Sequence, residues 1–249
     1  MRSVIHHHLH TIKTSEYLRI LILRTFGNFL VFSSLFMIGK TFYQPLVQEG
    51  RYLVDSVTQK TYVVADADGA VPTEAPVRGP TPTALPKGGL SAILSMNKVE
   101  VIRPEDPSFS IVIPKIDANS KIVANVNAAN ESEYLASLKN GVAHASGTAF
   151  PGEGGHIFLF AHSTDYFWNV STYNAVFFLL YKLEKKDEID IFYKNQKYVY
   201  TVIDSKIVEP DQVEYLTRKS NKEFLTLQTC WPPGTSLKRL LVFAVRAVE

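Results

Sequence analysis

The chain contains a single cysteine, Cys230, at the end of the apolar run FLTLQTC. A lone cysteine cannot form an intramolecular disulfide, and its spacing to other residues matches no zinc-binding pattern. The thiolate form of cysteine is a strong nucleophile when a base or a positive charge lies close by. Cys230 is therefore either an inert buried side chain or a reactive thiol, and its neighbours decide between the two.

Two residues have positions that suit them as partners of this thiol. His162 ends the apolar run IFLFAH, where a strand would deliver a side chain to the rim of the fold. Two such strands side by side would bring the imidazole next to the thiol. Arg239 follows Cys230 across WPPGTSLK, whose prolines and glycine form a loop that can turn the chain back. The guanidinium would then lie near the thiol and stabilise an oxyanion or hold a substrate carbonyl.

Each of these residues also has an ordinary structural interpretation. A lone cysteine is commonly a small buried side chain, a histidine is often hydrogen-bonded within a core, and an arginine usually belongs to the solvated surface. For each residue alone, that interpretation is the commoner one. Their joint position at strand ends favours chemistry.

The remaining histidines do not predict a metal site. His144 and His156 lie near His162 in the sequence, but their spacing matches no ligand motif, and we expect them to form hydrogen bonds in loops. The cluster HHHLH at residues 6–10 has no cysteine or carboxylate nearby to complete a site. We expect neither a metal ion nor another cofactor.

Composition restricts the class of protein. The chain has 249 residues, 46% of them hydrophobic and 12% aromatic, which is enough apolar material for a packed core and excludes a disordered protein. The net charge of +2 comes from interspersed acidic and basic residues, so no basic face predicts a nucleic-acid partner. One domain of the size of a small enzyme is the expected core.

Residues 17–43 have the composition of a membrane-spanning helix. Residues 25–39 carry no charge, and the basic residues at the two ends can reach the lipid headgroups. No alanine occurs before Ala65, so the A-x-A-like site of a cleaved signal peptide is absent. Basic residues are more frequent before this segment than after it. The sequence therefore predicts a single-pass signal anchor in the cell membrane, with residues 1–16 as a cytoplasmic tail and the remainder outside the cell.

The residues after the predicted membrane helix fall into segments of different composition. Residues 65–90 hold five of the thirteen prolines and almost no large apolar side chain, which is typical of an extended linker. We expect a membrane-proximal segment at residues 44–64 before this linker and the catalytic domain at residues 91–249 after it.

Short apolar runs separated by turn residues make the last domain mainly β. The expected strands lie at residues 110–116, 157–160, 188–203 and 240–248, with 188–203 forming two strands around a KNQK turn. Pro114 inside the first run indicates an edge position or a bulge. Only residues 131–138 and 175–183 have a helical pattern. This many short strands fits a closed barrel or a sandwich, and periodicity alone does not choose between them.

The same residues resemble the sortase family over roughly residues 108–249. Thr226, Leu227, Thr229 and Cys230 match a TLxTC signature, and Arg239 stands where the family has an arginine on the following strand. Three further segments resemble the family in order and spacing: SIVIPKI, GVAHASGTAFPGEGGHIFLFAHST and YVYTVIDSKIVEP. The anchor followed by a proline-rich linker is similar to the layout of such enzymes. One departure is Ala161-His162-Ser163, where many members have Gly-His-Arg.

The resemblance implies a sortase-type closed β-barrel with short helices, preceded by one transmembrane helix. It implies Cys230 as the nucleophile and His162 as the general acid and base. Arg239 would position the substrate and stabilise the oxyanion, and Thr229 would support the thiol.

The activity implied is that of a cysteine transpeptidase. It would cleave an LPxTG-like sorting signal at the C-terminus of a surface protein through a thioacyl intermediate. It would then join that protein to an amine, such as that of a peptidoglycan precursor or of another surface protein. Two alternatives stay open: a catalytically silent surface scaffold of the same fold, and a cysteine protease that hydrolyses the same intermediate.

Overall fold

The structure is a computed structural model that describes residues 14–58, 60–70, 99–163 and 175–247. The chain divides into two units, residues 1–44 and residues 45–249. The predicted cytoplasmic tail (1–16) and proline-rich linker (65–90) lie almost entirely outside the described residues.

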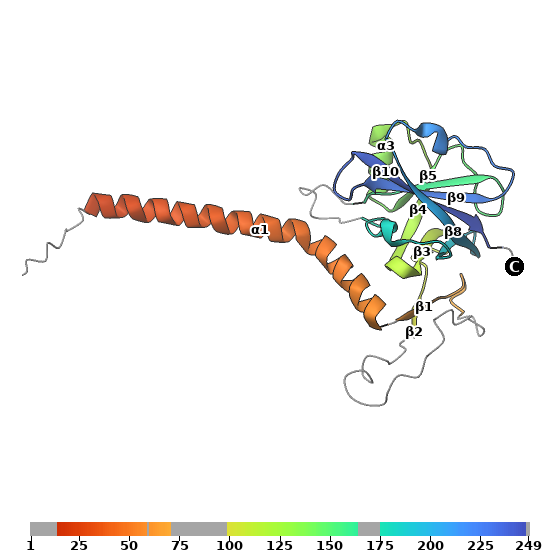
Figure 1. Cartoon of the computed structure of the whole chain (residues 1–249), viewed down its shortest axis with the longest axis horizontal. Helices are drawn as coiled ribbons and strands as arrows, with labels where there is room; N and C mark the ends of the chain where they lie inside the picture. Colours follow the sequence, from red (N-terminus) through yellow and green to blue (C-terminus); the bar gives the residue numbers. More distant parts are fainter. Residues whose placement is uncertain (1–13, 59, 71–98, 164–174, 248–249) are drawn as a thin grey trace, which may run out of the picture. The chain divides into compact units, whose positions relative to one another are not determined.

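Helix α1, Thr14–Thr58, begins in the first unit and ends in the second (Figure 1). Its segment Glu16–Tyr43 is apolar, and none of its described side chains is buried. The segment is long enough and apolar enough to cross a membrane, a test that a signal sequence also passes. Within it, the hydroxyl groups of Ser34 and Thr41 donate to backbone carbonyls one turn back, at 2.9 and 2.8 Å. Such internal hydrogen bonds satisfy polar groups where no water is present.

The last turns of α1 belong to the second unit. Their half-buried residues recur at helical spacing, at Gln48, Glu49, Tyr52 and Asp55, so one face of this stretch packs against the domain that follows. The segment predicted as membrane-proximal, residues 44–64, therefore contains a helical end that packs on the domain.

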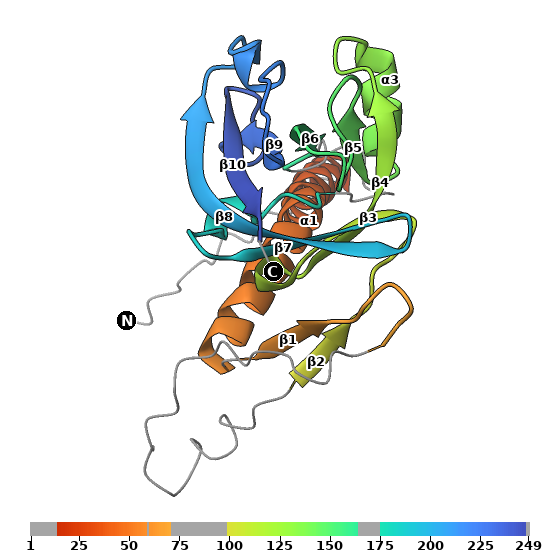
Figure 2. The same ribbon diagram turned by 90° about the vertical axis from the view of Figure 1, so that its right-hand side faces the viewer.

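Strand β1, Thr61–Val64, pairs in parallel with β2, Val99–Ile102. Val64 and Ile102 are buried in a small apolar cluster with Val112 and Phe192. Figure 2 shows this two-stranded ladder apart from the other strands, below β3 and β7. Residues on both sides of the predicted linker thus meet in one ladder.

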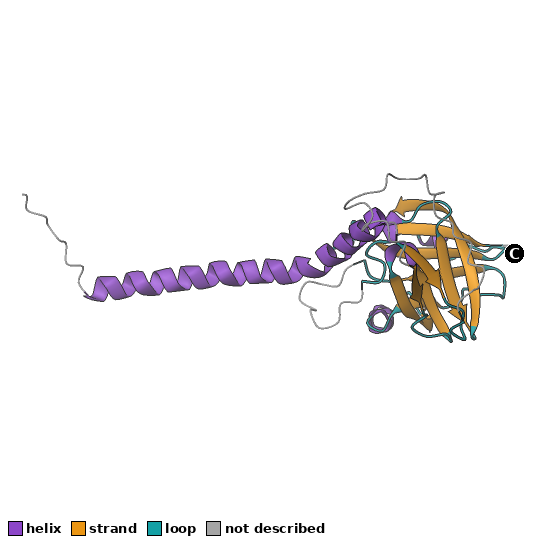
Figure 3. Cartoon of the chain, turned by 90° about the horizontal axis from the view of Figure 1, so that it is seen from below, coloured by secondary structure: helices purple, strands orange, loops and turns teal. Residues whose placement is uncertain are grey.

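The remaining eight strands form a closed barrel, as the resemblance implied (Figures 2 and 3). Their order around the barrel is β10-β8-β7-β3-β4-β5-β6-β9. The bounds are β3 Phe109–Ile113, β4 Ala118–Val126, β5 Val142–Ala145, β6 His156–Phe160, β7 Glu188–Tyr193, β8 Gln196–Val208, β9 Phe224–Trp231 and β10 Lys238–Arg246. The pairs β4–β5 and β6–β9 are parallel, and the other pairs in the barrel are antiparallel.

Short helical segments connect these strands. Helix α3, Glu131–Leu138, coincides with the helix expected at residues 131–138, and the Asn130 side chain caps it by accepting from the Glu133 N–H at 3.4 Å. Within the described ranges there are also three 3₁₀ turns: Pro114–Ile116, Leu180–Lys182 and Val213–Tyr215.

Two expectations need correction. Pro114 is neither in an edge strand nor at a bulge, because β3 ends at Ile113 and the proline opens a 3₁₀ turn, where its fixed φ and missing N–H suit the first position. The helix expected at residues 175–183 is reduced to turns and the 3₁₀ segment Leu180–Lys182.

The barrel interior is apolar and follows the alternation of each strand. On β9 the side chains of Leu225 and Leu227 point inward, and on β10 those of Leu240 and Val242 do so. The intervening residues of both strands point to the outer face. This assignment determines which side of the barrel wall carries Cys230.

Candidate active site

Cys230 lies on the outer face of the barrel wall, near the end of β9. It is three residues from Leu227, which points inward, so the alternation of the strand turns the thiol outward. Its side chain is half-buried and forms no disulfide. A thiol in this position is held by the sheet and still accessible from outside.

Arg239 lies directly opposite Cys230 in the antiparallel β9–β10 ladder. Residues opposite each other in such a ladder point to the same face, so the thiol and the guanidinium share the outer face. One guanidinium nitrogen, Nη1, donates to the backbone carbonyls of Ser236 and Lys238, each at 3.1 Å. Among the described residues Arg239 forms no ion pair with a carboxylate, and its remaining N–H groups have capacity to bind a substrate.

His162 lies two residues past the end of β6, on the other side of β9. The parallel β6–β9 register aligns Phe160 with Gln228, and Ala161 N–H then donates to the Gln228 carbonyl at 3.1 Å. The same offset aligns His162 with Cys230. His162 is half-buried, and its backbone carbonyl accepts from Phe177 N–H at 3.4 Å. The register therefore places the three predicted residues in one row, with His162 just past the end of β6, Cys230 on β9 and Arg239 on β10.

Thr229 joins the two strands at this row. Its hydroxyl donates to the Ala161 carbonyl at 2.9 Å, and its side chain is buried. This bond ties β9 to the residue immediately before His162, beyond the last aligned pair of the ladder. Thr229 thus has a structural reason to support the site: it fixes the end of β6.

His156 lies at the opposite end of β6 and is buried. Its Nδ1 is 3.2 Å from the Arg218 carbonyl, which can only accept, so Nδ1 carries the proton. Its Nε2 is 2.8 Å from the Thr226 hydroxyl, which donates to it. Burial lowers the pKa of His156 to about 4. This histidine is neutral and fully occupied in the core.

His144, on β5, has a similar environment, so both histidines form hydrogen bonds but lie in strands and not in the loops where they were expected. Its Nδ1 accepts from the Asn125 N–H at 3.3 Å, and its Nε2 donates to the Ala149 carbonyl at 3.0 Å. Burial lowers its pKa as well. The described residues contain no group of three or more histidine, cysteine, aspartate or glutamate side chains that would hold a metal ion.

The sequence did not indicate one set of neighbours of this site. The ring of Trp231, the residue after Cys230, lies 5.4 Å from the ring of Tyr181, and the Tyr181 hydroxyl donates to Glu49 of α1. These contacts are aromatic and polar, so they leave no apolar periodicity in the sequence around Glu49. The recurrence of half-buried positions every three or four residues in α1 becomes visible only once the helix is seen packed.

Comparison with known proteins agrees with this architecture. The sortase domain model matches residues 111–247, which is more than half of the chain. Sortase D of Bacillus subtilis (strain 168) is 30% identical over 149 residues, covering 58% of this chain and 67% of that protein.

Solved sortase structures are also similar. Sortase C-1 from Actinomyces oris (formerly Actinomyces naeslundii) has a TM-score of 0.48 at 30% identity, covering 58% of this chain and 76% of that one. The lid mutant of sortase A from Corynebacterium diphtheriae has a TM-score of 0.47 at 29% identity, covering 57% and 70%. The sequence matches alone, and above all that of the domain model, show that the chain belongs to the sortase family.

Proposed function

We propose that this protein is a membrane-anchored cysteine transpeptidase that uses Cys230, His162 and Arg239. Sortases are in general cysteine transpeptidases that act on sorting signals. The observation that carries the proposal for this chain is the pairing of Cys230 with Arg239 on the outer face of the barrel, at a half-buried strand end next to the end of β6. A nucleophile, a proton carrier and an oxyanion donor are the groups that acyl transfer requires.

In the first half of the reaction, the Cys230 thiolate attacks the carbonyl carbon of a Thr–Gly-like bond in an LPxTG-like signal. Arg239 donates hydrogen bonds to the oxyanion of the tetrahedral intermediate. As the C–N bond breaks, His162 gives its proton to the leaving amine. The products are a thioester on Cys230 and the released C-terminal fragment.

In the second half, an amine of a peptidoglycan precursor or of another surface protein attacks the thioester. His162 takes a proton from this amine, and the C–S bond breaks to return Cys230 as a thiolate. The surface protein is then attached through a new amide bond. Thr229 supports both halves by holding the end of β6 that bears His162.

The same proposal includes the location of the enzyme. The apolar segment of α1 would anchor it in the cell membrane as a single span, with the basic N-terminal end in the cytoplasm and the barrel outside. The length and apolar character of residues 16–43 support a single membrane span. The excess of basic residues before this segment supports the orientation.

The test is intact mass spectrometry of the full chain in detergent micelles, incubated with LPxTG-like peptides, with and without an oligoglycine amine. We expect an acyl adduct on Cys230 that disappears when the amine is added, together with the ligated peptide. Cys230→Ala should form neither and should keep the melting temperature of the wild type.

Hydrolysed peptide without ligation, even at high amine concentration, would instead identify a cysteine protease. A folded protein whose thiol reacts with iodoacetamide but which neither forms the adduct nor cleaves any peptide would contradict the proposal and favour a scaffold.

A further inference from the structure

The segment 175–183 contacts the ends of both strands of the candidate site. At its start, the Phe177 N–H donates to the carbonyl of His162 at 3.4 Å. At its end, the Tyr181 ring lies 5.4 Å from the ring of Trp231, at an interplanar angle of 56°. Trp231 follows Cys230 directly, so Tyr181 contacts the neighbour of the nucleophile.

Trp231 anchors a hairpin tip that has little other support. Of the residues between Trp231 and Arg239, all but Pro233 are exposed. Trp231 itself is half-buried and packs against the main core cluster, as Tyr181 does. Because the tip is otherwise open to solvent, the aromatic contact with Tyr181 restrains the end of β9 where Cys230 lies.

The last turns of α1 hold Tyr181 from the other side. The Tyr181 hydroxyl donates to one carboxylate oxygen of Glu49, and Lys182 Nζ lies 3.3 Å from the other. Lys182 also lies over the rings of Tyr52 and Tyr181, at 5.0 and 4.9 Å from their centroids. Burial, and then the bond to Glu49, raise the pKa of Tyr181, which keeps its hydroxyl protonated as a donor.

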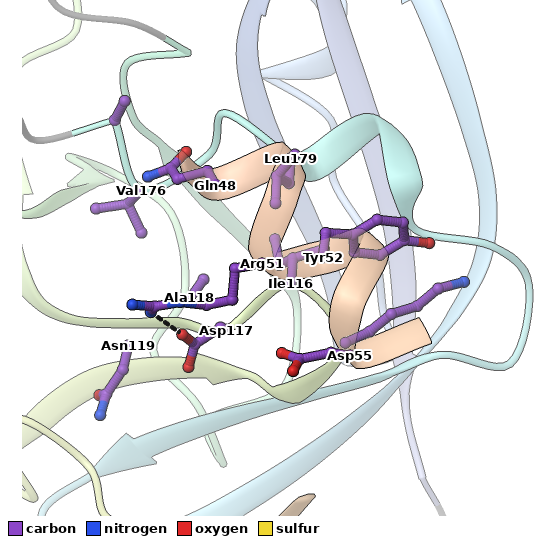
Figure 4. Close-up of a pocket in the computed structure, with 12 residues that line it drawn as sticks. Gln48, Arg51, Tyr52, Asp55, Ile116, Asp117, Ala118, Asn119, Val176 and Leu179 are labelled. Carbon is purple, nitrogen blue, oxygen red and sulfur yellow. Dashed lines mark hydrogen bonds and ion pairs between the residues drawn. The ribbon is translucent and has the colours of Figure 1, made fainter. Parts of the chain in front are cut away.

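A second contact fixes the same helical end to the barrel. Arg51 forms an ion pair with Asp117 at 2.7 Å, beside a cavity of about 250 Å³ between α1, the start of β4 and the segment 175–179 (Figure 4). Figure 4 shows Arg51 reaching from α1 to Asp117, with a dashed line marking their ion pair. The ion pair at Arg51 is separate from the contacts at Glu49, and only the hydrogen bond of Glu49 reaches Tyr181.

We propose that Tyr181 is a positioning residue for the reaction: its ring restrains Trp231, and with it Cys230, while Glu49 of α1 fixes its hydroxyl. The kinetic part of this inference rests on the function proposed above. The helix that leads out of the apolar segment thereby becomes part of the machinery that orients the nucleophile. A small displacement of a reacting group can slow catalysis strongly without changing the affinity for substrate.

The test compares four variants of the full chain in detergent micelles: Tyr181→Phe, Tyr181→Leu, Glu49→Ala and the double variant Tyr181→Phe/Glu49→Ala. Tyr215→Phe is the matched control, because Tyr215 is also a hydrogen-bonded aromatic residue, with Lys206 at 2.7 Å and Phe243 at 5.9 Å, but contacts no residue of the site. Measured are kcat and KM for peptide cleavage, the rate of Cys230 alkylation by iodoacetamide, and the melting temperature.

We expect Tyr181→Phe to lower kcat about threefold and Tyr181→Leu about tenfold, with KM within about twofold of the wild type. Glu49→Ala should lower kcat at least as much as Tyr181→Phe, because it also removes the ion pair with Lys182. The double variant should be no worse than Glu49→Ala, since both changes remove the same hydrogen bond. The alkylation rate of Cys230 should change by at least about twofold in Tyr181→Leu and stay constant in Tyr215→Phe.

If Tyr181→Leu kept the kcat and the Cys230 alkylation rate of the wild type, the proposal would be overturned. It would also be overturned if Tyr215→Phe, at the same melting temperature as the Tyr181 variants, showed the same loss of kcat. Fully additive effects of Tyr181→Phe and Glu49→Ala would refute the part assigned to α1. The alkylation rate requires no substrate. If the wild type cleaved no peptide, the proposed function would fail, while alkylation would still decide whether Tyr181 controls the surroundings of Cys230.

Discussion

The two ends of the β6–β9–β10 sheet carry the same kinds of residue in different surroundings. At one end, His156 on β6 lies next to Thr226 on β9, and both are buried. The ring of His156 contacts Phe158 and Phe224, with centroids 5.8 and 5.7 Å apart. Arg246, at this end of β10, lies 3.6 Å from the mostly buried carboxylate of Glu223.

At the other end, the corresponding residues are His162, Thr229 and Arg239. The histidine and the arginine are half-buried, and the arginine donates to backbone carbonyls with no acidic partner among the described residues. Cys230 lies between them. Three residue types thus occur at both ends of one sheet, and the histidine is buried at one end and half-buried at the other.

This difference teaches that residue type alone does not identify a catalytic group. A buried neutral histidine with both nitrogens hydrogen-bonded in the core cannot exchange a proton with a substrate, whereas the role proposed for His162 requires a ring that a substrate can reach. Substituting the same residue type at each end should therefore have different effects. Substitutions near Cys230 should lower activity, and those near His156 should lower stability.

The largest contrast is expected between the histidines. His162→Gln should lower kcat for peptide cleavage about 10²- to 10⁴-fold, because it removes the proton carrier, and should leave the melting temperature nearly unchanged. His156→Gln should lower the free energy of unfolding by about 1 to 3 kcal/mol, since buried partners lose hydrogen bonds. Its activity per folded molecule should equal that of the wild type. Peptide cleavage and urea denaturation measure the two effects, and equal losses of activity in both variants would remove the distinction.

The arginines should differ next. Arg239→Ala should lower kcat about 10²- to 10³-fold by removing a donor to the oxyanion. Arg239→Lys should restore little of it, because an ammonium lacks the planar fork of a guanidinium. Arg246→Ala, the matched change on the same strand, should cost about 1 kcal/mol of stability or less and no activity. An active Arg239→Ala enzyme would mean that another group stabilises the oxyanion.

The buried histidine should also make stability depend on pH. The pKa of His156 is about 4 in the folded chain, below its ordinary value of about 6.5. The unfolded chain therefore binds the proton first, so this contribution is complete above pH 6.5 and is lost as the pH falls toward 4. Between pH 7 and pH 5 the loss should be about 2 kcal/mol.

The difference between the wild type and His156→Gln isolates this effect, measured as urea denaturation at a series of pH values. Burial also lowers the pKa of His144, which has the same sign, and raises that of Asp190 to about 7, which has the opposite sign. Because His144 and Asp190 are present in both the wild type and His156→Gln, their contributions cancel in the difference between the two stabilities. Parallel stability curves for the wild type and the variant would show that His156 titrates normally.

Local patterns predicted the barrel strands well where the chain turns back on itself. The KNQK turn placed β7 and β8 correctly, because Lys194 and Asn195 adopt positive φ angles of 52° and 61° and join the strands by a tight hairpin. The row of His162, Cys230 and Arg239 was expected from strand ends and one loop, and the observed register aligns them. Their catalytic roles remain a prediction.

Features that depend on distant pairing could not be predicted. The β1–β2 ladder joins four-residue strands from either side of residues 65–98, and nothing local specifies such a pairing. The segment 175–183 was expected to be a helix from its pattern, but most of its residues are buried. An apolar run of that length does not distinguish a helix from irregular packing. The packing of residues 45–58 depends on polar contacts, so the sequence of this stretch has no recurring apolar positions from which the packing could be predicted.

The threonines should show the smallest contrast, and they test the support of the site rather than its chemistry. Thr229→Val keeps the shape of the side chain and removes only the bond to the Ala161 carbonyl, so it should lower kcat severalfold and stability by about 1 kcal/mol. Thr226→Val removes the donor to His156 and should cost about 1 to 3 kcal/mol with unchanged kcat. If the two variants lost activity in proportion to stability, the end of β6 would not need Thr229 to hold His162. If only Thr229→Val lost activity, the Thr229 hydroxyl would be needed for catalysis at the Cys230 end of the sheet, whereas the Thr226 hydroxyl at the other end would serve stability alone.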